Sequence, residues 1–143
     1  FDDYVDEYIK NSGKKIITLE EVIMIEENII KRCLDKIKLD DSEFNVLLTH
    51  QPQYIEIYAK YKYDLVFSGH AHGGQIRLPF IGPLMSPGQG FFPKYTSGLH
   101  TFENTKMIIS RGLGKSKLPF RFLNDPELII CKLSSESTNA DYT

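Results

Sequence analysis

Several kinds of residue are scarce in this sequence, and each scarcity narrows what the protein can be. Tryptophan is absent, and cysteine occurs twice, at Cys33 and Cys131. Two widely spaced cysteines form neither a disulfide framework nor a Cys-x-x-Cys metal clip, so we expect reduced core thiols and a cytoplasmic protein. No apolar run approaches the ~18 residues that cross a bilayer, which predicts that this chain has no transmembrane segment.

An excess of either charge is also lacking. Lys and Arg number 17 against 19 Asp and Glu, a net charge of −2, and no stretch is dense in basic residues. Nucleic-acid binding rests on clustered positive charge, so we do not expect nucleic acid as the main partner. In contrast, 41% hydrophobic residues in a chain of 143, with nine Phe and eight Tyr, are enough for one folded domain with its own core.

The first residue is Phe1 rather than Met, and acidic residues follow it directly. This beginning lacks the basic-then-apolar layout of a signal peptide. We therefore expect further sequence upstream, and that segment is where a membrane anchor would lie if the protein has one.

Helical patterns occupy the first third of the chain. Apolar residues at helical spacing predict a short helix over Asp2–Lys10. Thr18-Leu-Glu-Glu21 matches a capping box, in which hydroxyl and carboxylate bind free amide donors at a helix start. An apolar repeat from Val22 to Ile37 then predicts a long helix that covers a sheet.

A β-α-β unit follows, and both of its strands end in histidine. The strand-like segments are Phe44–His50 and Asp64–His70, and residues 51–62 are long enough for a crossover helix. A right-handed crossover brings the two strand ends to the same edge of a sheet, where open α/β sheets bind ligands. His50 and His70 are therefore expected to be neighbours.

The remainder is rich in turns. Seven of the ten glycines and four of the seven prolines lie in Gly69–Gly98, which predicts a long, mostly irregular and functional segment. Gly98–Phe102 and Lys106–Ser110 read as a hairpin, and Glu127–Leu133 as a final strand. We predict one domain over residues 1–133 and a flexible polar tail over 134–143.

His50, His70 and His72 are candidate metal ligands. The glycines around His70 and His72 let the backbone turn, so these two side chains can serve two neighbouring cations. Alternatively, the three imidazoles hold one zinc ion and leave a position for water. A two-metal hydrolytic centre also needs bridging carboxylates, and no acidic residue stands at a convincing strand end. Packing explains this histidine-glycine pattern poorly, because histidines add little apolar burial.

Two segments resemble the last two conserved blocks of the calcineurin-like metallophosphoesterases: Thr49-His50-Gln51-Pro52, and Ser68-Gly-His-Ala-His-Gly-Gly-Gln75. Downstream, Ser110-Arg-Gly-Leu-Gly-Lys-Ser-Lys-Leu-Pro-Phe-Arg-Phe122 and Asp125-Pro-Glu127 are similar to a bacterial branch of predicted phosphohydrolases. The resemblance covers roughly residues 44–133.

The resemblance implies that His50 and His70 ligate one metal and His72 the other. It implies hydrolysis of a phosphomonoester or phosphodiester by a metal-bound hydroxide, with two divalent ions, Mn, Fe or Zn. The family's earlier blocks, which supply the bridging aspartate and the acid histidine, are not found in residues 1–43. We therefore interpret the chain as the C-terminal half of the enzyme, inactive by itself.

Three residues are candidates for contact with the substrate phosphate: Gln75, Arg77 and Arg111. The expected substrate is a small phosphate ester or a phospholipid-like molecule, since an apolar group around Phe80 and Phe91 can form a wall or simply pack within its loop.

The fold class that follows is α/β: a mixed β-sheet with covering helices, the C-terminal half of a metallophosphoesterase-type α/β/β/α sandwich. Two other functions stay open, a non-catalytic metal-binding module and a self-contained mononuclear zinc hydrolase with three histidines.

Overall fold

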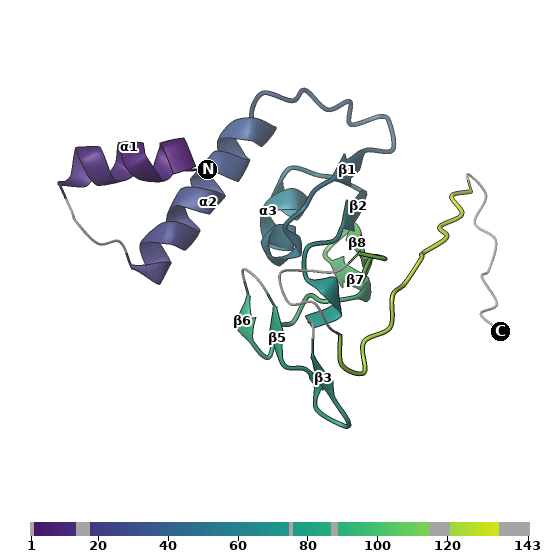
Figure 1. Ribbon diagram of the computed structural model, residues 1–143. Coiled ribbons are helices and arrows are strands. Elements are labelled where there is room, and N and C mark those ends of the chain that lie inside the picture. The colour runs from purple at the N-terminus through teal and green to yellow at the C-terminus, as the bar shows by residue number, and fades with distance from the viewer. Residues whose placement is uncertain (1, 14–17, 75, 87–88, 115–120, 135–143) are drawn as a thin grey trace.

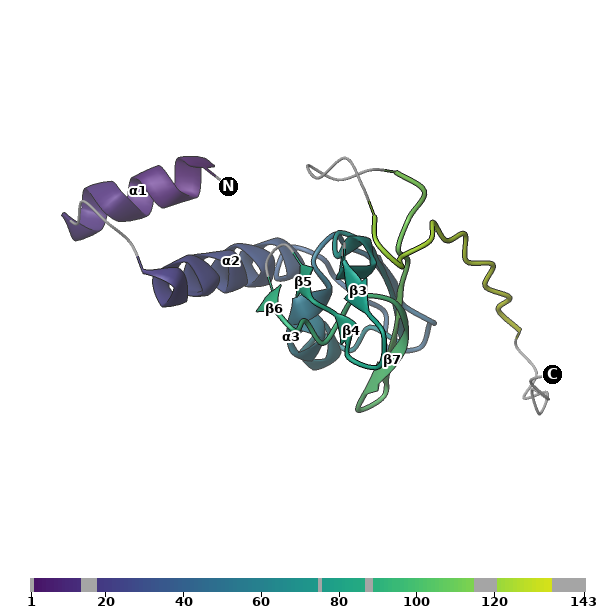
Figure 2. The same ribbon diagram turned by 60° about the horizontal axis from the view of Figure 1, so that its bottom comes forward.

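The computed structural model describes residues 2–13, 18–74, 76–86, 89–114 and 121–134 (Figure 1). It has a mixed α/β architecture, as the sequence predicts. A small sheet and one short helix form the centre, and two longer helices extend from it on the N-terminal side (Figures 1 and 2).

The two predicted N-terminal helices are present as α1 (Asp2–Ser12) and α2 (Leu19–Leu34). The capping box is confirmed, because the Thr18 amide donates to Glu21 Oε2 at 2.9 Å and the Glu21 amide donates to Thr18 Oγ1 at 3.3 Å. The Tyr8 hydroxyl donates to the other oxygen of Glu21 at 3.0 Å, which ties α1 to the start of α2.

Four strands form the main sheet in the order β1-β2-β8-β7. Strand β1 (Val46–Leu48) lies parallel to β2 (Leu65–Ser68), and β2 lies parallel to β8 (Thr105–Ile109). The hairpin partner β7 (Gly98–Phe102) runs antiparallel to β8, as predicted. The crossover between β1 and β2 contains the turn η1 (Pro52–Tyr54) and the helix α3 (Ile55–Lys60), which confirms the β-α-β unit.

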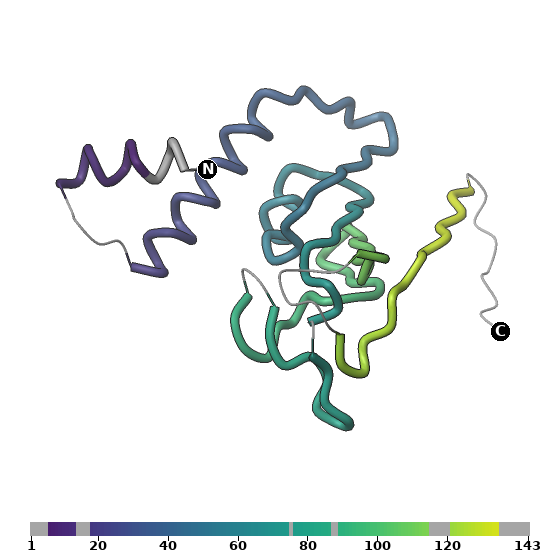
Figure 3. Tube along the Cα trace, in the orientation of Figure 1, coloured from purple at the N-terminus to yellow at the C-terminus, as the bar shows by residue number. Residues whose placement is uncertain are grey.

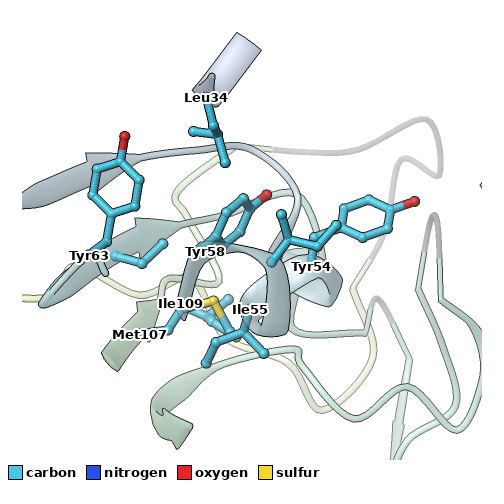
Figure 4. Close-up of a cluster of buried hydrophobic side chains, with 9 residues drawn as sticks. Leu34, Tyr54, Ile55, Tyr58, Tyr63, Met107 and Ile109 are labelled. Carbon is cyan, nitrogen blue, oxygen red and sulfur yellow. The ribbon is translucent and has the colours of Figure 1, made fainter. Parts of the chain in front are cut away.

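The core lies between α3 and one face of this sheet (Figure 4). Ile55 on α3 and Val66, Met107 and Ile109 on the strands are fully buried. The opposite face of the sheet is open at the edge strand β1, where Val46 is 42% and Leu48 is 78% exposed, whereas Leu65 beside Val46 is 4% exposed. Such an apolar face is typical of a surface that makes further contacts.

Helix α2 does not cover the sheet as predicted. It ends at Leu34, so the predicted repeat to Ile37 is too long, and only its C-terminal end reaches the core, through Leu34 and the partly buried Ile30. Ile23 and Met24 are exposed. The shorter helix α3 covers the sheet instead, because the crossover between two adjacent parallel strands lies directly over them.

The prediction of buried cysteines is also wrong, because Cys33 and Cys131 are both exposed free thiols. Cys33 continues the apolar repeat of α2, but in this last turn the neighbouring Leu34 is the residue that is buried in the core, and Cys33 stays exposed.

The predicted final strand over Glu127–Leu133 is irregular in the structure. Its beginning is held by the Glu127 amide, which donates to the Gly112 carbonyl at 3.2 Å. Further on, Leu128 is 75% and Ile130 is 90% exposed, and the segment runs apart from the sheet (Figure 3). Alternating apolar residues form a strand only beside a partner strand, and the described residues provide none here.

The turn-rich segment is mostly irregular, as expected, and contains two small antiparallel ladders. One pairs β3 (Arg77–Leu78) with β4 (Gly82–Pro83), and the other pairs β5 (Met85–Ser86) with β6 (Gly90–Phe91). Among the helices in the described ranges, none is both long and apolar enough to cross a membrane.

Met107 tests the position of the core. Because its side chain is fully buried between the sheet and α3, we expect Met107→Ala to lower the free energy of unfolding by about 2–5 kcal/mol, measured by urea denaturation. Leu99→Ala is the matched control on the same hairpin: Leu99 is 59% exposed, so a change within about 0.5 kcal/mol is expected. Equal losses in both variants would contradict this placement of the core.

Candidate metal centre

Two imidazoles meet at the carboxyl edge of the parallel strands. His50 lies two residues beyond the end of β1 and His70 two residues beyond the end of β2, as the β-α-β unit predicts. His70 Nδ1 and His50 Nε2 are 2.6 Å apart, and the ring centroids are 4.3 Å apart. His50 is exposed and His70 is half-buried, so the pair opens to solvent on one side.

The contact between these nitrogens requires one proton that the two rings share. One nitrogen has to carry the proton and the other has to accept it, because two protonated or two bare nitrogens repel at this distance. The pKa of His70 lies below its usual range, first through burial and then through the neighbouring His50 and His72. A neutral imidazole is the form that binds metal ions.

A buried tyrosine holds the loop that carries His50. The Tyr58 side chain on α3 is 1% exposed, and its hydroxyl donates to the Gln51 carbonyl at 2.8 Å. Since that bond uses the only phenolic proton, the Thr49 hydroxyl donates to Tyr58 in the 3.0 Å contact between their oxygens. Residues on both sides of His50 are thereby tied to one rigid side chain. No local sequence pattern reveals this role, because Tyr58 simply follows the apolar repeat of α3.

The loop after His70 is strained. His70 and His72 have φ of 64° and 46°, a left-handed conformation that costs roughly 1–2 kcal/mol per residue with a side chain. Gly73 follows with φ of 68°. The predicted turn at these residues is thereby confirmed.

Asn124 packs closely against this loop. Its amide group donates to the His72 carbonyl at 2.6 Å. A β-carbon at Gly73 would lie 2.1 Å from Asn124 Oδ1, so only glycine leaves room for this residue. Asn124 is almost fully buried and lies 52 positions further along the chain, which is why no local pattern reveals it.

The three predicted histidines are only partly brought together. His50 and His70 converge, whereas His72 is half-buried nearby and lies close enough for the charge of His50 to help lower its pKa, after burial and Arg121. Within the described ranges, no group of three or more His, Cys, Asp or Glu is arranged to hold a metal ion. The residues therefore fit two imidazole ligands of one cation, and the role of His72 stays a prediction.

The predicted phosphate contacts lie beside the same loop. Arg77 Nη1 donates to the Gly73 carbonyl at 3.1 Å. Arg111 follows β8, and its Nε is 4.0 Å from Glu127 Oε2. Gln75 falls outside the described residues. His100, the fourth histidine, lies on strand β7 instead, and its Nε2 is 3.0 Å from the Ser97 carbonyl.

Several known proteins are similar in sequence to this chain. The chain is 42% identical over 98 residues to "Uncharacterized metallophosphoesterase YkuE" of Bacillus subtilis (strain 168), a match that covers 68% of this chain and 34% of the relative. It is 37% identical over 93 residues to "UDP-2,3-diacylglucosamine pyrophosphatase LpxG" of Chlamydia muridarum, covering 61% of this chain and 28% of the relative. It is 32% identical over 88 residues to "Phosphodiesterase YaeI" of Escherichia coli (strain K12), covering 62% and 32%.

Over about two thirds of its length, the chain is thus a relative of the metallophosphoesterases, which confirms the resemblance seen in its histidine motifs. It spans about a third or less of the length of these curated relatives. No family model matches the chain, and no solved structure matches it significantly.

Tyr58→Phe tests whether Tyr58 positions His50. The variant removes the donor to the Gln51 carbonyl and leaves the ring in place. We expect it to weaken Zn²⁺ binding by roughly 10–100-fold in calorimetric titration, the usual effect of losing a residue that orients a ligand. Tyr61→Phe is the control, because the Tyr61 hydroxyl donates to Asp35 at the C-terminal end of α2 and not to the loop of His50. Unchanged Zn²⁺ affinity in Tyr58→Phe would contradict the role.

The lowered pKa values of His70 and His72 predict a pH dependence of the metal-free chain. The unfolded chain takes up protons at these residues near pH 6.5, before the folded chain does. The free energy of unfolding is therefore highest above about pH 6.5 and falls as the pH drops toward the folded pKa values. Urea denaturation in EDTA between pH 5 and 8 checks this, and His70→Asn should flatten the profile. An equally steep profile in His70→Asn would count against it.

Proposed function

We propose that this chain is the C-terminal, histidine-bearing part of a divalent-metal-dependent phosphohydrolase. The convergence of His50 and His70 at the carboxyl edge of two parallel strands carries this proposal. Two nitrogen donors that meet at a sheet edge suit borderline cations such as Zn, Fe or Mn. When bound, two such cations would draw charge from the phosphoryl oxygens and activate water.

The chain's own residues have separate tasks in this proposal. His50 and His70 would hold one cation through the two nitrogens that lie 2.6 Å apart, and the proton between them would have to move to the outer nitrogen of its ring or leave the pair. His72 serves the second cation from the strained loop. The bridging carboxylate and the acid histidine come from sequence outside this chain, since its described residues do not assemble a larger ligand group.

The relatives support a phosphate ester or phosphoanhydride as the substrate. One is named a phosphodiesterase and another a pyrophosphatase, and both names describe hydrolysis at phosphorus. A phospholipid-like substrate is compatible with the exposed Phe80 and Phe91 in the turn-rich segment. The other two functions, a metal-binding module and a mononuclear zinc hydrolase, gain no comparable support, because His72 is not grouped with the other two histidines.

Metal binding and turnover test the proposal together. We expect this chain to bind Zn²⁺ or Mn²⁺ in calorimetric titration and to lose that binding in His50→Ala and His70→Ala. We expect no metal-dependent hydrolysis of bis(p-nitrophenyl) phosphate by the chain alone. His100→Ala is the matched control, because this histidine lies on β7 and contacts the Ser97 carbonyl and the Tyr95 ring rather than the histidine pair.

Either of two results would contradict this view. Metal-dependent turnover by the chain alone, lost in His72→Ala, would favour a self-contained three-histidine site. Metal binding that survives in both His50→Ala and His70→Ala would place the cation elsewhere.

A further inference from the structure

Three arginines surround the loop that carries His70 and His72. Arg77 donates to the Gly73 carbonyl at 3.1 Å. The Arg111 side chain packs on the same glycine, since a β-carbon at Gly73 would lie 3.0 Å from Arg111 Cγ. Arg121 in turn donates to the Arg111 carbonyl at 3.0 Å. We call these residues the arginine cluster.

The position of Arg111 follows from the sheet. Strand β8 runs parallel to β2, so its carboxyl end lies at the same edge as those of β1 and β2. Arg111 comes two residues after β8, as His50 and His70 come two residues after their strands. The Arg111 guanidinium group and the imidazoles of His50 and His70 therefore lie at the same edge of the sheet, where open α/β sheets bind ligands.

The backbone beside Arg111 is firmly held. The Arg111 amide donates to Glu127 Oε2 at 3.2 Å, and the Gly112 amide donates to the Ser110 hydroxyl at 3.0 Å. Arg121 Nη2 binds the carbonyls of Arg111, Gly112 and Gly114. Arg121 is therefore a positioning residue that fixes the turn from which the Arg111 side chain extends.

Many donors of the cluster are unused. Arg111 Nε and Arg121 Nη1 are buried and have no hydrogen-bond partner in the described structure. Arg111 lies 4.0 Å from Glu127 Oε2, which is too long for a hydrogen bond. Arg77 uses one nitrogen on Gly73. A buried donor without a hydrogen-bond partner destabilises the folded chain. An acceptor that reaches such a donor removes this cost, which favours binding of the acceptor.

The positive charge of the cluster is also poorly balanced. Among the described residues, Glu127 is the one carboxylate within 4.0 Å of any of the three guanidinium groups. Three positive charges against one negative leave a formal charge of +2. The pKa of Arg77 is lowered, first by burial and then by Arg111, which agrees with this crowding of like charge.

We propose that the arginine cluster binds a dianionic phosphoryl group next to the histidine pair. Resting on the proposed function, this group is a second, non-reacting phosphate of the substrate, beside the phosphorus that is attacked. The formal charge of +2 matches a phosphate dianion, and guanidinium groups bind phosphate oxygens through paired donors. The preferred substrate class is then a phosphate ester or anhydride with two phosphoryl groups rather than a simple monoester.

Calorimetric titration of the metal-free chain with inorganic phosphate tests the site without any hydrolysis. EDTA is present throughout, so the histidine pair holds no cation. We expect Arg111→Gln and Arg77→Gln to weaken phosphate binding by roughly tenfold or more, the effect of losing charge-assisted hydrogen bonds. Arg111→Lys keeps the charge but loses the paired donors, so it should fall between Arg111→Gln and the unmodified chain.

Lys106→Gln is the control for net charge, because Lys106 is an exposed cation on β8, outside the cluster. We expect it to bind phosphate like the unmodified chain, and we expect acetate, a monoanion, to bind more weakly than phosphate. Equal losses in Lys106→Gln and Arg111→Gln, acetate binding as tight as phosphate binding, or no phosphate binding by a folded chain would overturn the proposal.

The proposed metal site and the proposed phosphate site can be tested independently of each other. His70→Ala should lose Zn²⁺ binding and keep phosphate binding, whereas Arg111→Gln should weaken phosphate binding and keep Zn²⁺ binding. Far-UV circular dichroism of each variant confirms that it is folded. If either folded variant loses both Zn²⁺ binding and phosphate binding, the result would contradict a separate anion site.

Discussion

The parallel pairing of β1, β2 and β8 is the constraint on which the rest of this structure depends. Parallel strands place their carboxyl ends at one edge, so the residues that follow them meet although they lie far apart in the sequence. His50, His70 and Arg111 each stand two residues beyond one of these strands. The buried contacts of α3 with Val66 and Met107 stabilise the pairing, and through it the site.

At this edge of the sheet, strained backbone is held in place by hydrogen bonds from neighbouring side chains. Left-handed backbone at His70 and His72 is unfavourable for residues with side chains, and it persists where surrounding contacts compensate for it. Here the compensation comes from Asn124, which binds the His72 carbonyl and fills the space over Gly73. On the other side of the pair, Tyr58 holds the loop at His50. Neither support is itself a metal ligand, yet both decide where the imidazoles point.

The site is also uneven in its charge. A lowered pKa favours the neutral form of His70, whereas the arginine cluster with Glu127 carries a formal charge of +2. Cations at the histidines would add to this positive field, and an anion such as a phosphate ester would relieve it. This polarity agrees with the relatives, whose names describe hydrolysis of phosphodiesters and pyrophosphates.

Local patterns in the sequence determined the elements of this protein: the capping box of α2, the β-α-β unit with its two terminal histidines, and the β7–β8 hairpin. The capping box and the hairpin depend on residues a few positions apart, and the β-α-β unit follows from the rule that a right-handed crossover joins adjacent parallel strands. Tertiary structure alone decided that α3 rather than α2 covers the sheet, that Glu127–Leu133 forms no strand in the described structure, and that Arg121 and Asn124 support the site. These outcomes depend on contacts between residues distant in sequence, and burial or hydrogen bonding at such a distance leaves no periodic signal in the chain.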